Sequence, residues 1–250
     1  RESEAEPMRM LVTRPEPDAA DTAARLAALG IEATVCPLLT FSVLPASLPE
    51  PQGFAALALT SAAALRALEE RGALAGYLGL RVFAVGERTA AAARELGFAT
   101  VESAGGSLSA LAERLAHAGL RGPVFYPAAR DQSGDLAKSL APYGVMVITA
   151  QIYAMNAINA LPMDVREDLL EGRIGAATFY SRRTAETFVR LAGDGLDRAA
   201  RNRLGMLCLS ETVAEPLVEA HFVRISLADY PSEEAMMGLA LSFARDQNAS

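Results

Sequence analysis

Short apolar runs alternate with amphipathic helical stretches along nearly the whole chain. The first unit predicts a strand near residues 9–13, a helix over about 18–29 that ends at Gly30, and a second strand over 32–36. After a proline-rich stretch, further strands are predicted in AALAL, RVFAV, ATVES, PVFYP, VMVITAQIY, GAATFY, LGMLCL and FVRIS, with AMNAINALP as a polar connection. Repeated strand–helix units favour parallel sheets with helices on both faces, so the predicted fold class is α/β.

The second half of the chain echoes the first. Segment 56–68, ALALTSAAALRAL, is similar to segment 176–188, AATFYSRRTAETF, because each is an apolar strand that ends in a hydroxyl residue and opens a helix. VFAVGERTAAAARELGF then follows the first copy much as GMLCLSETVAEPLVEAHF follows the second. Two similar halves predict two lobes with binding at the carboxyl ends of the strands. Chance similarity between alanine-rich units is the alternative.

Composition and charge narrow the function. The chain has 250 residues, of which 51% are hydrophobic, and this is enough core for one large domain or two modest ones. Its net charge of −7 argues against nucleic acid, and an anionic ligand would need a local collection of arginines and backbone amides. No apolar run approaches the roughly 20 residues of a membrane span, and RESEAEPMRM has no signal core. We therefore expect a cytoplasmic protein without membrane contact, with tails at 1–7 and 247–250.

No metal or organic cofactor is expected. Cys36 and Cys208 lie in apolar runs and are interpreted as reduced packing residues, whereas His117 and His221 stand alone and are interpreted as helix-surface residues. The chain also lacks a phosphate-binding P-loop and a complete dinucleotide fingerprint.

One strand-to-helix turn could still hold an anion. The turn from Gly86 to Thr89, through Glu87 and Arg88, places backbone amides at a helix N-terminus, and Thr89 adds a hydroxyl. A carboxylate fits such a turn at least as well as a phosphate. An ordinary turn with a helix cap is the alternative.

A pair of arginines gives a second hint of an anion. Arg182 and Arg183 stand at the start of a predicted helix, where the helix dipole disfavours cations. A nearby anion would explain their position.

Several motifs together carry a resemblance to a known family. LVTRPEPDAADTAARLAALGIEATVCPLL, LTSAAALRAL, VFAVGERTAAAARELGF, VFYPAARDQSGDLAKSLAPYGVMVITAQIY and ATFYSRRTAETF resemble, in this order, the uroporphyrinogen-III synthase family from Met10 to about Ala244. The resemblance implies two similar lobes, each a parallel sheet flanked by helices, joined by two antiparallel hinge strands. The implied boundaries are 8–40 plus 154–246 for lobe 1 and 41–153 for lobe 2, with hinge strands near 38–44 and 147–153.

The resemblance also implies a reaction. Members of this family take the linear tetrapyrrole hydroxymethylbilane, remove water and close the ring to uroporphyrinogen III while inverting the last pyrrole, in haem biosynthesis. The reaction is a cofactor-independent lyase step, and a monomer is expected. The other class of function that stays open is a two-lobed protein that binds or senses a small anion or a tetrapyrrole without converting it.

Site residues follow from the motifs one at a time. Tyr153 matches the hinge tyrosine of the family, its leading candidate for a proton donor; a packing role is equally compatible with its place. Arg14 would face substrate carboxylates or be a solvated loop arginine. The remaining positions match strand-end hydroxyls, which could also be plain helix caps, and a commonly basic loop: Thr60, Ser61, Ser181 and Arg130.

The second lobe departs from the family pattern at its glycine-containing turn. Ser210 stands where the glycine is expected, and Val213 stands where the threonine is expected. Thr212 lies one residue earlier, so either the hydroxyl has shifted by one position or this lobe contributes less to binding. The backbone amides of the turn could serve in both cases.

Overall fold

A computed structural model describes residues 8–248, which form two compact units. Unit 1 contains the chain up to Thr40 and from Asn156 onward, and unit 2 is Phe41–Met155. Most of the predicted tails, residues 1–7 and 249–250, lie outside the described part. The last helix, α11 (Glu233–Asn248), continues into the predicted C-terminal tail.

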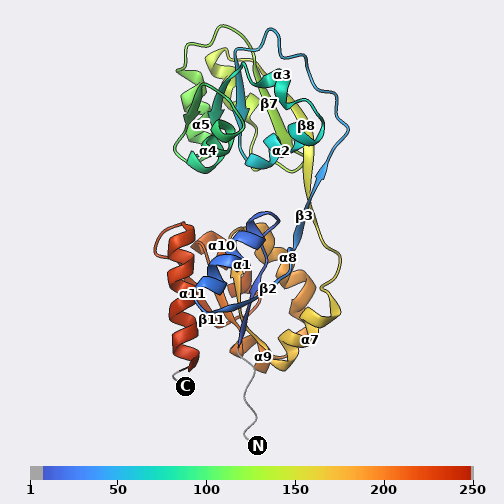
Figure 1. Ribbon diagram of the computed structural model, residues 1–250, viewed down its shortest axis with the longest axis vertical. Coiled ribbons are helices and arrows are strands. Elements are labelled where there is room, and N and C mark those ends of the chain that lie inside the picture. The colour runs from blue at the N-terminus through green and yellow to red at the C-terminus, as the bar shows by residue number, and fades with distance from the viewer. Residues whose placement is uncertain (1–7, 249–250) are drawn as a thin grey trace, which may run out of the picture. The chain divides into compact units, whose positions relative to one another are not determined.

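Unit 1 is built on a sheet of five strands in the order β11–β10–β9–β1–β2 (Figure 1). All neighbouring strands are parallel, so their carboxyl ends meet at one edge, the carboxyl edge of unit 1. The strands are β1 (Arg9–Val12), β2 (Glu32–Val35), β9 (Ile174–Phe179), β10 (Gly205–Cys208) and β11 (Arg224–Leu227).

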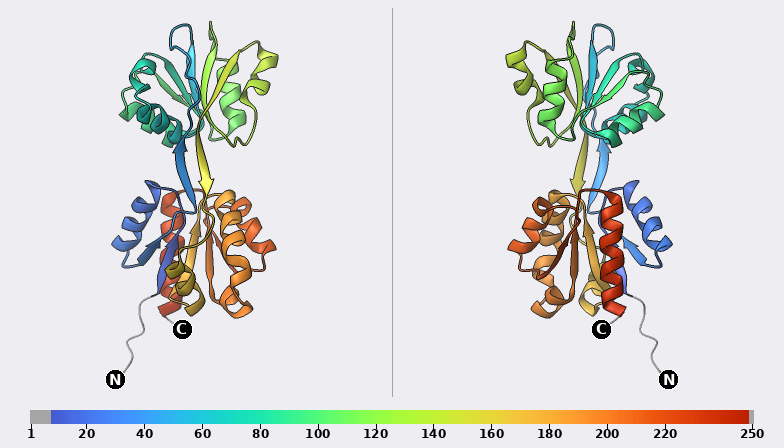
Figure 2. Two further views of the ribbon diagram at one scale, coloured as in Figure 1. Left: turned by 90° about the vertical axis from the view of Figure 1, so that its right-hand side faces the viewer. Right: turned by 90° about the vertical axis from the view of Figure 1, so that its left-hand side faces the viewer.

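Helices cover both faces of this sheet (Figure 2). Met10 and Val12 point into one core cluster and Leu11 into the other, as strand alternation requires. Both faces are buried, which explains why β1 reads as a continuous apolar run. One face packs against α1 (Asp18–Ala28) and α11, and the other against α7 (Met163–Glu171), α8 (Arg182–Ala192), α9 (Arg198–Arg203) and α10 (Glu211–Glu219), with a 3₁₀ turn η2 at Gly193–Gly195.

Unit 2 carries a second sheet, in the order β3–β8–β7–β4–β5–β6. The pairs from β8 to β6 are parallel and define the carboxyl edge of unit 2. The strands are β3 (Leu39–Val43), β4 (Ala56–Leu59), β5 (Arg81–Ala84), β6 (Val101–Ser103), β7 (Val124–Ala129) and β8 (Val147–Ala157).

The strands β3 and β8 run antiparallel, as the resemblance implied. The Leu44 amide donates to the Ile152 carbonyl at 2.8 Å, and the Ile158 amide donates to the Leu38 carbonyl at 3.0 Å. Residues later in β3 therefore pair with residues earlier in β8, which is the antiparallel arrangement. β8 extends to Ala157, so the start of the predicted polar connection is strand, because its backbone stays paired with β3.

The faces of the second sheet are also covered by helices. Leu57 and Leu59 belong to one core cluster, whereas Ala56 and Ala58 belong to the other. The first face packs against α2 (Ala62–Glu70), α3 (Leu74–Tyr77) and α4 (Glu87–Glu95), and the second against α5 (Leu108–Ala116) and α6 (Leu136–Leu140), which is followed by a 3₁₀ turn η1 at Ala141–Tyr143.

These observations confirm the predicted fold class, an α/β chain with two parallel sheets flanked by helices. Cys36 and Cys208 are buried free thiols, as predicted. No helix within residues 8–248 is long and apolar enough to cross a membrane.

Candidate active site

Four hydroxyl groups gather where β4 ends in unit 2. Thr60 and Ser61 directly follow β4, and the Thr60 hydroxyl lies 3.1 Å from the phenol oxygen of Tyr126 on β7. The Ser61 hydroxyl interacts with the phenol of Tyr153 on β8. Tyr126 packs with the core cluster of α5 and α6, and Tyr153 with that of α2 to α4, so the phenols reach β4 from opposite faces. We call these four residues the phenol–hydroxyl cluster.

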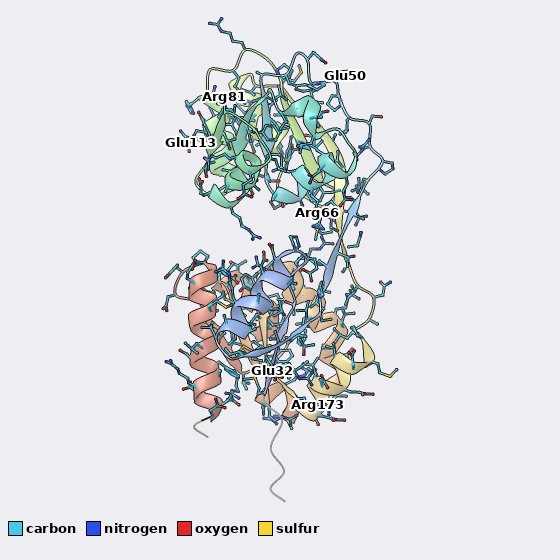
Figure 3. All side chains as sticks on the ribbon, in the orientation of Figure 1. Glu32, Glu50, Arg66, Arg81, Glu113 and Arg173 are labelled. Carbon is cyan, nitrogen blue, oxygen red and sulfur yellow. The ribbon has the colours of Figure 1, made fainter. Side chains whose placement is uncertain are left out.

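Tyr153 is held rigidly and keeps its proton. Its side chain is 3% exposed, and its ring stacks on Phe41 at a centroid distance of 5.9 Å. The Arg66 guanidinium, which projects from α2, lies 4.3 Å from the centroid of Phe41 (Figure 3). Burial raises the pKa of Tyr153 to about 12, although the Ser61 hydroxyl opposes this rise. The phenol is therefore neutral at physiological pH and can donate a proton.

Ser61 both caps α2 and faces Tyr153. Its Oγ accepts the Ala63 amide proton at 3.1 Å, as the capping interpretation predicted. Because that contact uses an acceptor site, the hydroxyl proton of Ser61 stays available for the Tyr153 oxygen. This arrangement leaves the phenol proton of Tyr153 free for another acceptor.

The turn at Gly86 has no side-chain cap. Gly86 precedes α4 in an extended conformation, with no side-chain cap, and the first bond of the helix runs from the Ala90 amide to the Gly86 carbonyl at 3.0 Å. The amides of Glu87, Arg88 and Thr89 consequently have no intrahelical partner. Thr89 is 7% exposed, so its side chain is largely buried.

Unit 1 repeats the same backbone at Ser210. Ser210 has φ −156° and ψ 169°, against −154° and 175° at Gly86, and its side chain does not cap α10. Val213, in register with Thr89, is buried, whereas Thr212 is exposed. The Thr212 hydroxyl therefore does not take the buried position that Thr89 has in unit 2. The turn still has no side-chain cap, although it carries Ser210 where unit 2 has Gly86.

Ser181 closes the neighbouring turn of unit 1. It caps α8, accepting the Thr184 amide proton at 3.2 Å, and its hydroxyl also lies 2.8 Å from the Thr184 hydroxyl. The capping interpretation is confirmed here as well. The first turns of α2 and α8 are capped by serine side chains, whereas those of α4 and α10 are not.

Arg14 is not a solvated loop arginine. Its side chain is 12% exposed and bonds to Glu233 at 3.1 Å and to Asp18 at 3.4 Å. The guanidinium also lies 3.9 Å from the centroid of the Tyr180 ring and donates to the Thr22 hydroxyl at 3.2 Å. A substrate carboxylate at Arg14 would have to compete with two carboxylates of the protein itself.

Two further predicted arginine positions, Arg182 and Arg130, are also engaged. Arg182 pairs with Glu186 at 2.9 Å and with Glu215, so its place at a helix start is balanced by the protein's own carboxylates and does not by itself indicate a ligand. Arg130 is about half exposed and lies 3.5 Å from Asp131. Its backbone amide donates to the Tyr153 carbonyl at 2.8 Å, which places the basic loop next to the phenol–hydroxyl cluster.

Tyr126 is the member of the cluster that the sequence did not reveal. In PVFYP it is one apolar-looking residue of a buried strand, and no spacing distinguishes it from Phe125. Its proximity to Thr60 follows only from the sheet order, in which β7 lies beside β4. The sequence alone does not give that order. Residues 8–248 contain no group of three or more side chains that could hold a metal ion.

Comparisons with known proteins agree with this architecture. Two solved structures with similar folds are uroporphyrinogen-III synthetase from Helicobacter pylori (TM-score 0.66, 20% identity, 94% of this chain and 99% of that chain covered) and a mutant uroporphyrinogen III synthase from Thermus thermophilus (TM-score 0.58, 20% identity, 96% and 99% covered). A search of curated proteins finds no match. The sequence model of uroporphyrinogen-III synthase HemD matches residues 20–238, most of the chain, and the chain therefore belongs to the uroporphyrinogen-III synthase family.

Proposed function

We propose that this chain is a cofactor-independent lyase that dehydrates and cyclises hydroxymethylbilane to uroporphyrinogen III, with inversion of the terminal pyrrole. Its family makes it an enzyme of tetrapyrrole biosynthesis. The observation that carries the finer proposal is the neutral Tyr153 phenol, buried beside Ser61 at the carboxyl edge of unit 2.

The chemistry needs one proton donor. The pyrrole nitrogen expels the hydroxyl group of the terminal hydroxymethyl carbon and leaves a cationic azafulvene. Tyr153 gives its proton to the departing oxygen, so that water leaves, and the Ser61 hydroxyl stabilises the resulting phenolate. Ring closure passes through a spiro intermediate, and the proton lost from the last pyrrole carbon returns to Tyr153. The atoms balance, because the net loss is one water.

Recognition of the substrate requires donors for many carboxylates, since each pyrrole carries an acetate and a propionate. We propose that the uncapped turns at Gly86 and Ser210 supply backbone amides for this purpose, one turn in each unit. The amides of Glu87 and Arg88 precede Thr89 in the first of these turns. Thr60 and Ser181 follow β4 and β9, which lie beside β5 and β10, the strands that lead into these turns. The loop of Arg130 follows β7, on the other side of β4. Thr212 and Arg182 would contribute less to substrate binding, because both lie at the surface of unit 1.

The remaining parts of the proposal concern the state of the enzyme. We propose that it works as a cytoplasmic monomer, without a metal or an organic cofactor and without nucleic acid as a partner. Its net charge of −7 supports the exclusion of nucleic acid.

Isomer analysis tests the function directly. The protein is incubated with enzymatically generated hydroxymethylbilane, and the products are oxidised and separated by isomer. The inverted type III isomer is expected. Formation of the spontaneous type I isomer alone would favour the alternative, a two-lobed protein that binds a tetrapyrrole without converting it.

A further inference from the structure

A pocket of about 570 Å³ opens in unit 1, at the sheet edge opposite the turns of Ser181 and Ser210. It is lined by Leu196, Arg198, Arg201, Asn202, His221 and Val223. Residues 196–202 precede β10 and residues 221–223 precede β11, so the pocket lies where these strands begin. Ser181 and Ser210 follow the ends of β9 and β10, at the opposite edge of the same sheet. We call it the amino-edge pocket.

The backbone at His221 is unusual. It is the one non-glycine residue with positive φ, 65°, within residues 8–248. It follows the C-cap of α10, where the His221 amide donates to the Val218 carbonyl and the Phe222 amide to the Leu217 carbonyl. A left-handed residue at this position of a helix end is normally glycine, since a side chain there costs stability.

The internal repeat allows His221, after α10, to be compared with the corresponding residue after α4, Gly97. At the end of α4 the amides of Gly97 and Phe98 make the same two bonds, to Arg94 and Ala93, and Gly97 has φ 103°. His221 therefore occupies the position that is glycine in the other unit, and its imidazole is added to a backbone that does not need it. Residues kept in a costly conformation concentrate at functional sites.

The neighbouring side chains form a small recognition set. The side chains of Arg198, Asn202 and His221 have no bonding partner within residues 8–248 and line the same pocket. Arg201 is different, because its three guanidinium nitrogens donate to the carbonyls of Leu196, Ala220 and Gly193. Arg201 thus holds the backbone that lines the pocket in place, including the Ala220 carbonyl directly before His221. Arg198 is then the lining cation that is available to a ligand.

We propose that the amino-edge pocket is a second binding site, for a small monoanion with an apolar body, such as an aromatic monocarboxylate. One free guanidinium matches one negative charge and offers the planar fork that suits a carboxylate. The amide of Asn202 and the imidazole of His221 supply further hydrogen bonds, and Leu196 and Val223 give an apolar wall. The volume is within the range of pockets for small molecules.

Benzoate is the probe that tests this site in the full chain. The chain has only two histidines, so the Cε1–H signal of His221 is followed by NMR with that of His117, in unit 2, as an internal control. We expect benzoate to shift His221 and not His117, with a Kd of about 1–10 mM. Acetate should bind more weakly, and benzamide, which lacks the charge, should not bind up to about 50 mM. Equal shifts of both histidines, or equal binding of benzamide, would overturn the proposal.

Substitutions separate the site from the fold. Arg198→Gln should weaken benzoate at least about tenfold, because it removes a charge-assisted bond, whereas Arg203→Gln, on the same helix but outside the pocket, should not. His221→Gly, followed through the Val223 amide, should weaken benzoate about threefold and raise the unfolding midpoint by about 2–4 °C, because the left-handed backbone then suits its residue. Unchanged benzoate affinity in either pocket variant would contradict the assignment.

Discussion

The Tyr126 phenol lies 3.1 Å from the Thr60 hydroxyl, directly after β4. Tyr126 is buried, and Thr60 is its one side-chain hydrogen-bond partner within residues 8–248. Either oxygen can donate in this pair, and in both arrangements the contact orients the Thr60 hydroxyl at the end of β4. An oriented Thr60 hydroxyl suits a substrate carboxylate.

Tyr126→Phe therefore tests a positioning role. The ring stays, but the hydroxyl that orients Thr60 is lost, so we expect product affinity to fall by about three- to tenfold with kcat nearly unchanged. Product titration and initial rates measure this. Thr60→Val is the matched control, and the double variant should be no weaker than the weaker single variant. Fully additive losses would show that the two hydroxyls act independently.

Tyr153→Phe tests the proton donor. We expect kcat to fall by about 100-fold or more, while product affinity stays within about threefold, because the proton is transferred in the transition state. Since the pKa of Tyr153 is about 12, its ionisation should not reduce the rate between about pH 6 and pH 9. A normal kcat in Tyr153→Phe would assign the residue to packing against Phe41.

The turn at Gly86 provides a test of backbone against side chain. Arg88→Pro removes one amide donor in the first turn of α4, where proline is tolerated, whereas Arg88→Ala keeps it. We expect the proline variant to bind product about tenfold more weakly than the alanine variant. Thr89→Val should cost no more than the proline variant, since unit 1 already carries Val213 in register.

Circular dichroism serves as the folding control for these variants. A folded Arg88→Pro that binds normally, together with a Thr89→Val that does not, would assign recognition to the hydroxyl instead of the amides.

The buried thiols predict a loss of stability in alkali. Burial raises the pKa of Cys208 from 9.0 to about 12, so the unfolded thiol ionises above pH 9 while the folded thiol stays protonated. The stabilisation is complete below pH 9 and is lost as the pH rises toward 12. Between pH 8 and pH 10 this one group lowers the free energy of unfolding by about 1.4 kcal/mol. Cys208→Ala should remove that part of the pH dependence, as measured by urea unfolding at both pH values; an unchanged dependence would contradict it.

Much of the fold was accessible from the sequence because parallel strands and their helices leave a strong local pattern. The strand at β1, the helix that ends before Gly30 and the Ser61 and Ser181 caps all follow from residues that are neighbours in the chain. The end of β8 does not follow from its neighbours in the chain. Its last residues form a strand because they pair with β3, more than 100 residues earlier.

The side-chain partners could not be predicted, for the same reason. The sequence left Arg14 as either a carboxylate-binding arginine or a solvated loop arginine. Its partner Glu233 begins the last helix of the described chain, and no local pattern links the two. Tyr126 looked like core until the sheet order placed it beside Thr60. The left-handed conformation of His221 could be predicted only from the repeat, in which His221 aligns with Gly97.

The discontinuity of unit 1 has a consequence for synthesis on the ribosome. Unit 2 is one continuous segment, so it can fold as soon as Met155 has emerged. β1 sits between β2 and β9, and β9 begins only at Ile174. Met10, Leu11 and Val12, all fully buried in the finished protein, must therefore wait with a single strand partner while more than 100 residues are translated. Until β9 is made, the apolar side chains of β1 stay incompletely covered, and such transiently exposed surface favours aggregation.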